Sequence, residues 1–298
     1  MVNKAVKIRL KGHESFYIRE GWIRKGITAI VKEPGILASS SAIDELGVGA
    51  NMVKSIRYWL QVLGLTEEVR LKGGKRGQVL TKDFGTILFD KDSYFEDNLS
   101  LALMHYKLVT NIELATSWYI FFNKVGVKEF TKINLISIME QQIRNLDATI
   151  EFSMKSLIDD CTCILKTYLY DKEDLKKPED NLISPFTELG LLSKIKVKGK
   201  EEIFQKTAPE KEKLDKLVIL YVIVDRLKGS TSTTIDRLIE EDCNVGKVFN
   251  LDRNVLNEYL DELEDGGFIK INRTAGLNTI YINEINTKEI LEKYFNGQ

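Results

Sequence analysis

Hydrophobic residues near the start of the chain repeat with the period of an α-helix. Residues 19–32 carry one apolar stripe, and Pro34 then predicts the end of that helix. A short serine-capped helix is predicted over 39–49 and a further helix over 51–64. Residues 65–85 predict two strands that flank a glycine-rich basic tip. Three helices followed by a hairpin is the element order of a winged helix-turn-helix.

The remainder of the chain predicts helices with small hairpins. Residues 94–170 contain four apolar segments and predict a helical middle domain, whereas 171–213 combine charge-rich loops with a small hairpin. The last segment repeats the order of helices and a hairpin. We therefore predict a mainly α fold with small β-hairpins (α+β). Its domains would be a basic winged helix-turn-helix at 1–92, a helical domain at 93–210 and an acidic winged-helix-like domain at 211–298.

Charge is distributed unevenly along the 298 residues. The net charge is −1, but residues 1–90 hold 15 Lys and Arg against 9 Asp and Glu, giving +6. The remaining residues hold 28 against 35, giving −7. A basic N-terminal region favours a polyanionic partner, although a difference of this size also arises by chance.

The predicted helix over 51–64 carries polar donors outside its apolar stripe. Such donors bond base edges and phosphates when a helix enters the major groove, and a basic hairpin tip adds phosphate contacts. The alternative is a protein-docking module with an ordinary charged surface. The predicted DNA-binding residues are Asn51, Lys54, Ser55, Arg57, Tyr58, Gln61, Lys72, Lys75 and Arg76.

The corresponding helix near the C-terminus has the opposite charge. Its acidic residues would repel phosphates, so this region is predicted to dock a protein or simply to pack. These residues are Glu258, Asp261, Glu262, Glu264 and Asp265.

The opening segment, "GHESFYIREGWIRKG" at 12–26, supplies candidates for phosphodiester chemistry. His13 or Glu14 would act as a general base or metal ligand, and Arg19 with Lys25 would hold the scissile phosphate. Neighbouring His13 and Glu14 reach one site only if the preceding glycine permits a turn. The alternative is a plain strand-to-helix connection, with Glu14 as an N-terminal helix charge and His13 on the surface.

Other chemistry-bearing residues have simpler interpretations. His105 is expected to be a satisfied histidine, and Cys161, Cys163 and Cys243 to be reduced thiols without a redox or metal role. Core packing is expected of Trp118, Tyr119, Phe121 and Phe122. A carboxylate cluster past the hairpin is either a solvated loop or a Mg²⁺ site. Its residues are Asp83, Asp90, Asp92, Glu96 and Asp97.

Several functional classes receive no support from the sequence. The chain contains no phosphate-binding loop, HExxH, GxSxG or dinucleotide-binding glycine pattern. It has no apolar run of roughly 18 residues for a membrane span and no signal-peptide pattern at its start, so we expect a cytoplasmic protein.

Several strings together resemble a bacterial family of unassigned domain type. This family includes the B component of the single-stranded DNA phosphorothioation system. The strings are, in order, "GHESFYIREGWIRKG", "LGVGANMVKSIRYWL", "LTKDFGTILFDKDSYFED", "LALMHYKLVTN", "WYIFFN" and "VGKVFNLDR".

The resemblance implies a DNA-nicking protein that works beside a cysteine desulfurase and ATPases. Those partners place sulfur on the DNA backbone as part of an anti-phage defence. The resemblance also places His13, Glu14, Arg19, Trp22 and Lys25 in the family's motif-like start. Nicking would need a divalent metal ion, Mg²⁺ or Mn²⁺, with Glu14 as a candidate ligand.

Two main hypotheses follow from these observations. The first is a metal-dependent nicking endonuclease that binds double-stranded DNA. The second is a non-catalytic DNA-binding adaptor or transcriptional regulator that recruits partner enzymes through its acidic C-terminal domain. A protein-docking scaffold without DNA contact is a third hypothesis.

Overall fold

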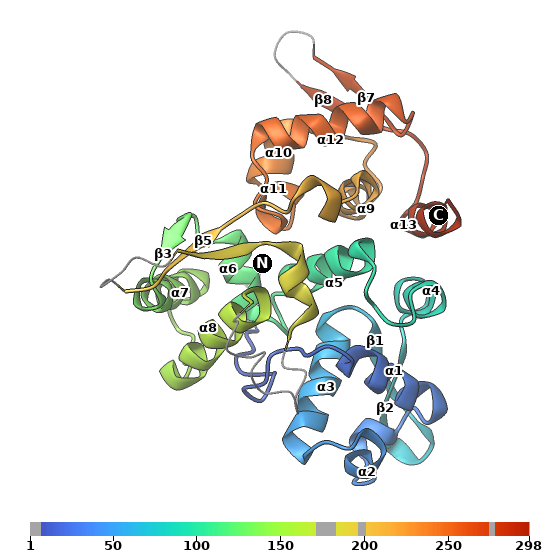
Figure 1. The fold of residues 1–298 in the computed structure, drawn as a ribbon, viewed down its shortest axis with the longest axis vertical. Helices are drawn as coiled ribbons and strands as arrows, with labels where there is room; N and C mark the ends of the chain where they lie inside the picture. The colour runs from blue at the N-terminus through green and yellow to red at the C-terminus, as the bar shows by residue number, and fades with distance from the viewer. Residues whose placement is uncertain (1–6, 171–182, 196–200, 274–277, 298) are drawn as a thin grey trace.

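The computed structural model describes residues 7–170, 183–195, 201–273 and 278–297. Helices predominate, and the strands form three small antiparallel sheets (Figure 1). The predicted α+β class is therefore confirmed. None of the described helices is both long enough and apolar enough to cross a bilayer.

The N-terminal region has the predicted order of three helices and a hairpin. Glycine at position 26 lets α1 lie close to α3, because a Cβ there would fall 2.7 Å from Ile56 Cγ2. The hairpin strands pair from Thr66 opposite Leu80 to Arg70 opposite Arg76. The elements are α1 (Trp22–Lys32), η1 (Ile36–Ala38), α2 (Ala42–Leu46), α3 (Ala50–Val62), β1 (Thr66–Arg70), η2 (Lys72–Gly74) and β2 (Arg76–Leu80).

The middle of the chain is helical, as predicted, with one three-stranded sheet of order β3-β5-β4. The helix pair α7 and α8 packs beside α6, and η4 packs against α5 and α8. The elements are α4 (Phe84–Lys91), α5 (Asn98–Thr110), α6 (Thr116–Asn123), β3 (Glu129–Phe130), α7 (Lys132–Leu146), α8 (Met154–Tyr168), η4 (Pro185–Leu189), β4 (Leu192–Ile195) and β5 (Ile203–Lys206).

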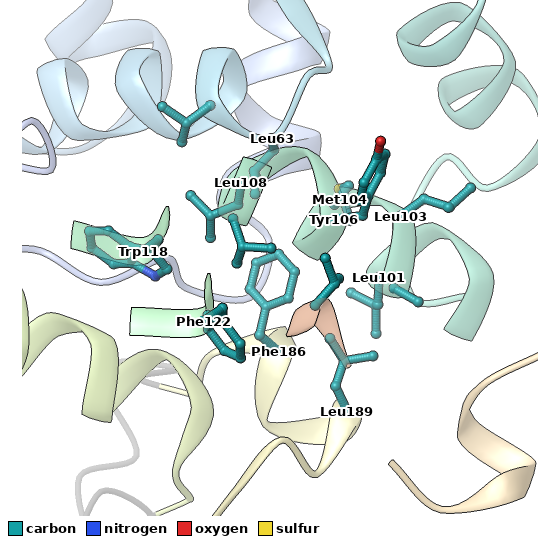
Figure 2. Close-up of a cluster of buried hydrophobic side chains, with 14 of the residues drawn as sticks. Leu63, Leu101, Leu103, Met104, Tyr106, Leu108, Trp118, Phe122, Phe186 and Leu189 are labelled. Carbon is teal, nitrogen blue, oxygen red and sulfur yellow. The ribbon is translucent and has the colours of Figure 1, made fainter. Parts of the chain in front are cut away.

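Helix α5 is the centre of the hydrophobic core. Its sequence is apolar on nearly every face, which is typical of a helix surrounded by protein. Figure 2 shows its side chains among Leu63 after α3, Trp118 and Phe122 of α6, and Phe186 and Leu189 of η4. The buried residues form one cluster that runs through the N-terminal, middle and C-terminal regions.

The predicted aromatic core is confirmed at three of its four positions. Trp118, Phe121 and Phe122 are buried. Tyr119 is instead half-buried, and its hydroxyl donates a hydrogen bond to Asp242 at 2.8 Å.

The C-terminal region contains the predicted buried helix, short helices and hairpin, together with an additional strand, β6, beside the hairpin. Its sheet order is β6-β8-β7. In Figure 1 this region lies at the opposite end of the molecule from α2. The elements are η5 (Lys211–Lys213), α9 (Lys216–Leu227), β6 (Ser232–Thr234), α10 (Ile235–Glu240), α11 (Val245–Val248), α12 (Arg253–Asp265), β7 (Ile269–Asn272), β8 (Thr279–Ile282) and α13 (Thr287–Asn296).

Ion pairs and partial burial reduce the exposed negative charge on the acidic face of α12. Lys211 pairs with Glu262 at 2.6 Å and with Glu258 at 3.5 Å, and Arg273 pairs with Asp261. Of the predicted exposed residues, Glu262 and Glu264 are half-buried, whereas Glu258, Asp261 and Asp265 are exposed.

Candidate nucleic-acid interface and opening segment

A basic groove of about 980 Å³ lies between α3, η1 and the tip of the hairpin. Lys54 and Arg57 line it from α3, and Lys75 and Arg76 line it from the hairpin. The two pairs of cations are separated in the sequence by strand β1 and the hairpin turn. Because β2 runs antiparallel to β1, it leads the chain back towards α3. The groove therefore collects positive charge from two elements on one surface.

Three further predicted DNA contacts do not line this groove. Asn51 and Lys72 are exposed, and Gln61 is half-buried. Lys54 Nζ donates a hydrogen bond to Asn51 Oδ1 at 3.3 Å. Arg57 pairs with Glu68 of β1 at 2.7 Å, so an anionic ligand would have to compete with that carboxylate.

The prediction that Ser55 and Tyr58 contact DNA is wrong for this conformation, because both side chains are buried. Ser55 Oγ donates a hydrogen bond to the carbonyl of Phe16 at 3.4 Å. Tyr58 is 3% exposed, and burial raises the pKa of its hydroxyl well above the usual range. The helix packs against both α1 and the opening segment, so it buries more than the one stripe that its periodicity predicts.

The opening segment forms a tight turn between residues 11 and 16. Glu14 N donates to the Lys11 carbonyl at 3.2 Å, and Phe16 N donates to the His13 carbonyl at 2.8 Å. Lys11, Glu14 and Ser15 have φ values of 56°, 52° and 71°, which are uncommon outside glycine. Such a cluster of strained residues persists only where the surrounding contacts determine it.

Gly12 is required by the close packing of this turn against α3. A Cβ at this position would lie 2.4 Å from Cε2 of Tyr58, a ring held within the core. The predicted glycine turn is therefore present, but its effect is to bring the chain close to α3.

His13 points into the protein from this turn. It is 0% exposed, and its ring lies beside Tyr58, Trp59 and Trp118. Its Nε2 donates a hydrogen bond to Asp160 Oδ1 at 2.8 Å. The alternative prediction of a surface position for His13 is wrong, because the side chain is enclosed, whereas its role as a general base stays a prediction.

Asp160 of α8 is the residue that organises the opening segment. This carboxylate is 1% exposed and accepts hydrogen bonds from Lys11 N at 2.8 Å and Ser117 Oγ at 2.5 Å, in addition to His13. It thereby joins the opening segment to α6 and α8. The sequence contained a signal for it, since Asp160 stands in the apolar stripe that includes Leu157 and Ile164.

The proposed catalytic residues do not converge. Glu14 is half-buried at the turn, and Lys25 is exposed on α1. The Arg19 guanidinium lies 5.1 Å from the ring of Trp22 and lines a separate cavity. These groups are close in the sequence, but the turn directs His13 into the core, whereas Lys25 is exposed and Glu14 is half-buried.

Among the described residues, no group of three or more His, Cys, Asp or Glu side chains is positioned to hold a metal ion. Asp92 accepts hydrogen bonds from the backbone of Glu96 and Asp97 at 3.2 and 3.1 Å, and Asp97 caps α5 through Leu99 N at 2.8 Å. In the predicted carboxylate cluster, these two acids therefore stabilise the loop before α5. No such group includes Glu14, and its role as a metal ligand stays a prediction.

The three cysteines are buried, free thiols. Burial raises the pKa of Cys161 to about 12 and that of Cys243 to about 11, and it raises the pKa of Cys163 well above its usual range. A thiol that stays protonated is a poor nucleophile.

His105 is a satisfied histidine, as the sequence indicated, and it lies in the core. Its Nε2 donates to the Val248 carbonyl at 2.8 Å, and its Nδ1 accepts from the Tyr168 hydroxyl at 2.7 Å. Burial lowers the pKa of this imidazole from 6.5 to about 3.

This shift predicts a loss of stability in acid. Below pH 6.5 the unfolded chain binds a proton that folded His105 excludes until about pH 3, so stability falls as the pH falls through this range. Between pH 7 and 4.5 the wild type should lose about 2–3 kcal/mol more than His105→Gln, measured by urea unfolding. Parallel pH profiles for the two proteins would contradict the prediction.

These features define an α+β protein with a basic groove on its N-terminal region and a tightly anchored opening segment. The chain belongs to the DUF4007 family, described as a protein of unknown function, whose model matches residues 10–295. No curated protein matches the chain.

Two crystal structures of SspB have similar folds. A magnesium-bound SspB structure has a TM-score of 0.85 and 24% identity, with 96% of this chain and 88% of that chain covered. A second SspB structure has a TM-score of 0.84 and 25% identity, with 98% and 90% covered. The expected membership in the family that includes SspB is thereby confirmed.

Proposed function

We propose that this protein is a DNA-binding component of a bacterial DNA phosphorothioation system. The observation that carries this proposal is the convergence of Lys54, Arg57, Lys75 and Arg76 on one groove. Cations from a helix and a hairpin tip that face one groove can follow a phosphate backbone. The likeness to SspB structures supports the assignment to the phosphorothioation system.

In this proposal the N-terminal region works as a winged helix-turn-helix. The exposed side of α3, with Asn51 and Lys54, would face the major groove, and the β1–β2 tip with Lys72 would contact the backbone. Arg57 would exchange Glu68 for a phosphate or a base. Residues 1–92 would then form the DNA-binding domain.

The remaining regions would organise protein partners in the cytoplasm. Residues 93–210 would form the helical domain that anchors the opening segment. Residues 211–298 would form a winged-helix-like domain whose exposed acids, including Asp265, suit protein docking better than DNA. The resemblance described above makes the cysteine desulfurase and ATPases the partners to test.

Nicking is proposed as the activity of the opening segment, with Glu14 as its test residue. Glu14 is the carboxylate that the turn leaves partly accessible beside buried His13. A non-catalytic adaptor is the second candidate function, and the burial of His13 favours it. The two functions differ in one measurable property, which is cleavage of a DNA strand.

A plasmid assay separates these two functions. With Mg²⁺ or Mn²⁺, the wild type should convert supercoiled plasmid to open circles, and EDTA should prevent this. Glu14→Gln should slow nicking about a hundredfold, as expected for loss of a general base, with unchanged DNA affinity. Glu113→Gln, an exposed acid on another surface, should nick normally. Intact supercoils combined with salt-sensitive DNA binding would establish the adaptor instead.

A further inference from the structure

A second cavity, separate from the basic groove, lies at the N-terminal end of α1. It occupies about 210 Å³ between the start of α1, the segment before α5, and η4. This volume is below the roughly 300 Å³ at which pockets for drug-sized ligands begin. The cavity therefore suits one small ring system.

Arg19 lines this cavity and carries an unused hydrogen-bond donor. Its Nε is buried and has no hydrogen-bond partner among the described residues. The guanidinium lies over aromatic rings, 5.1 Å from the centre of Trp22 and 5.8 Å from that of Phe16. Aromatic faces stabilise the positive charge, but they do not satisfy an N–H aimed in the guanidinium plane. A ligand atom that accepts a hydrogen bond would satisfy it.

The walls of the cavity suit a flat aromatic ligand. Ile23, Phe95 and Leu101 supply apolar surface, and Tyr94 adds an aromatic ring that is 57% exposed. The guanidinium of Arg24 lies 3.7 Å from the centre of the Tyr94 ring. Planar heterocycles gain binding energy from such aromatic and apolar walls.

The rim of the cavity selects against free anions. Glu20, Glu96 and Glu188 line it and are exposed. Lys213 pairs with Glu188 at 3.1 Å, so Glu20 and Glu96 are the carboxylates that repel phosphate groups. The same oxygens accept hydrogen bonds from exocyclic amino groups. The cavity thus combines one donor with several acceptors around a small apolar space.

We propose that this cavity binds a nucleobase. Arg19 Nε would donate to a carbonyl oxygen or ring nitrogen of the base, and the rim carboxylates would accept from its amino group. The base can come from a free nucleoside or from a DNA strand with one base turned out of the stack. The first source does not depend on the proposed DNA-binding function.

Saturation-transfer NMR on the full chain tests the proposal with adenosine, guanosine, cytidine and thymidine. At least one nucleoside should bind, and its 5′-monophosphate should bind no more tightly because of the acidic rim. Arg19→Gln should lower the affinity about tenfold, as expected for one hydrogen bond from a charged donor. Thr187→Trp, which fills the cavity from η4, should abolish binding, and Lys128→Gln, an exposed cation elsewhere, should have no effect.

A second arm distinguishes the two sources of the base. Single-stranded and duplex oligonucleotides containing 2-aminopurine should show an Arg19-dependent fluorescence change if the cavity accepts a base from DNA. If the oligonucleotides bind with normal affinity but show no Arg19-dependent fluorescence change, the cavity binds free nucleosides and not a base from DNA. Absence of nucleoside binding at millimolar concentration, or equal binding by wild type and Arg19→Gln, would overturn the proposal while leaving the groove untouched. Thermal unfolding of each variant verifies that it is folded.

Discussion

Replacing Lys54, Arg57, Lys75 and Arg76 together with glutamine is expected to lower affinity for duplex DNA about a hundredfold near 0.1 M salt. The four cations line one groove from α3 and from the hairpin. Each phosphate contact releases condensed counterions, so losing four contacts should also reduce the slope of log affinity against log salt by about 3 to 4. Fluorescence anisotropy over a salt series measures both quantities.

The control variant for this experiment has the same change in net charge, but at positions outside the groove. Glutamine at Lys128, Lys155, Lys270 and Lys288, all exposed and outside the groove, also removes four positive charges. This variant should retain a slope within about one of the wild-type value. If both variants lost affinity equally, long-range charge would account for binding and the groove would not be the interface.

Replacing Asp160 with alanine is expected to lower the free energy of unfolding by about 3–5 kcal/mol. The change leaves buried donors from His13, Lys11 and Ser117 without their acceptor. Because the strained turn at Glu14 depends on these contacts, proteolysis within the opening segment should also become faster.

The neighbouring aspartate provides a matched control. Asp159 pairs with Lys11 at 2.7 Å through partly exposed side chains, and Asp159→Asn should leave the unfolding free energy nearly unchanged. Asp160→Asn keeps the size of the side chain and one acceptor oxygen. Its free energy of unfolding should lie between those of Asp160→Ala and Asp159→Asn. Urea unfolding compares the three variants. Equal stability of Asp160→Ala and Asp159→Asn would show that the buried hydrogen bonds do not anchor the segment.

Local signals in the sequence predicted much of the N-terminal region. The stripe in 19–32, the stop at Pro34 and the glycine-rich basic tip correspond to α1, its end and the turn between β1 and β2. The predicted cations Lys54 and Arg76 also lie on one groove. Helix periodicity and turn preferences depend on residues that are only a few positions apart, so they can be recognised in a single sequence.

Contacts between distant segments could not be predicted in this way. Periodicity placed Tyr58 on an exposed face, but the opening segment covers that face. His13 and Glu14 are adjacent in the sequence, and left-handed backbone at the turn gives their side chains different environments. Asp160 lies 147 residues from His13, so no local pattern links the two.

The sequence by itself determined the helices, the hairpins, the charge asymmetry and the family of this protein. Only the tertiary structure decided which polar side chains face solvent, which cations share a groove, and which of the opening residues serve the core. The physical reason is that burial and hydrogen bonding depend on the elements that cover a side chain. In this protein, those elements come from distant parts of the chain.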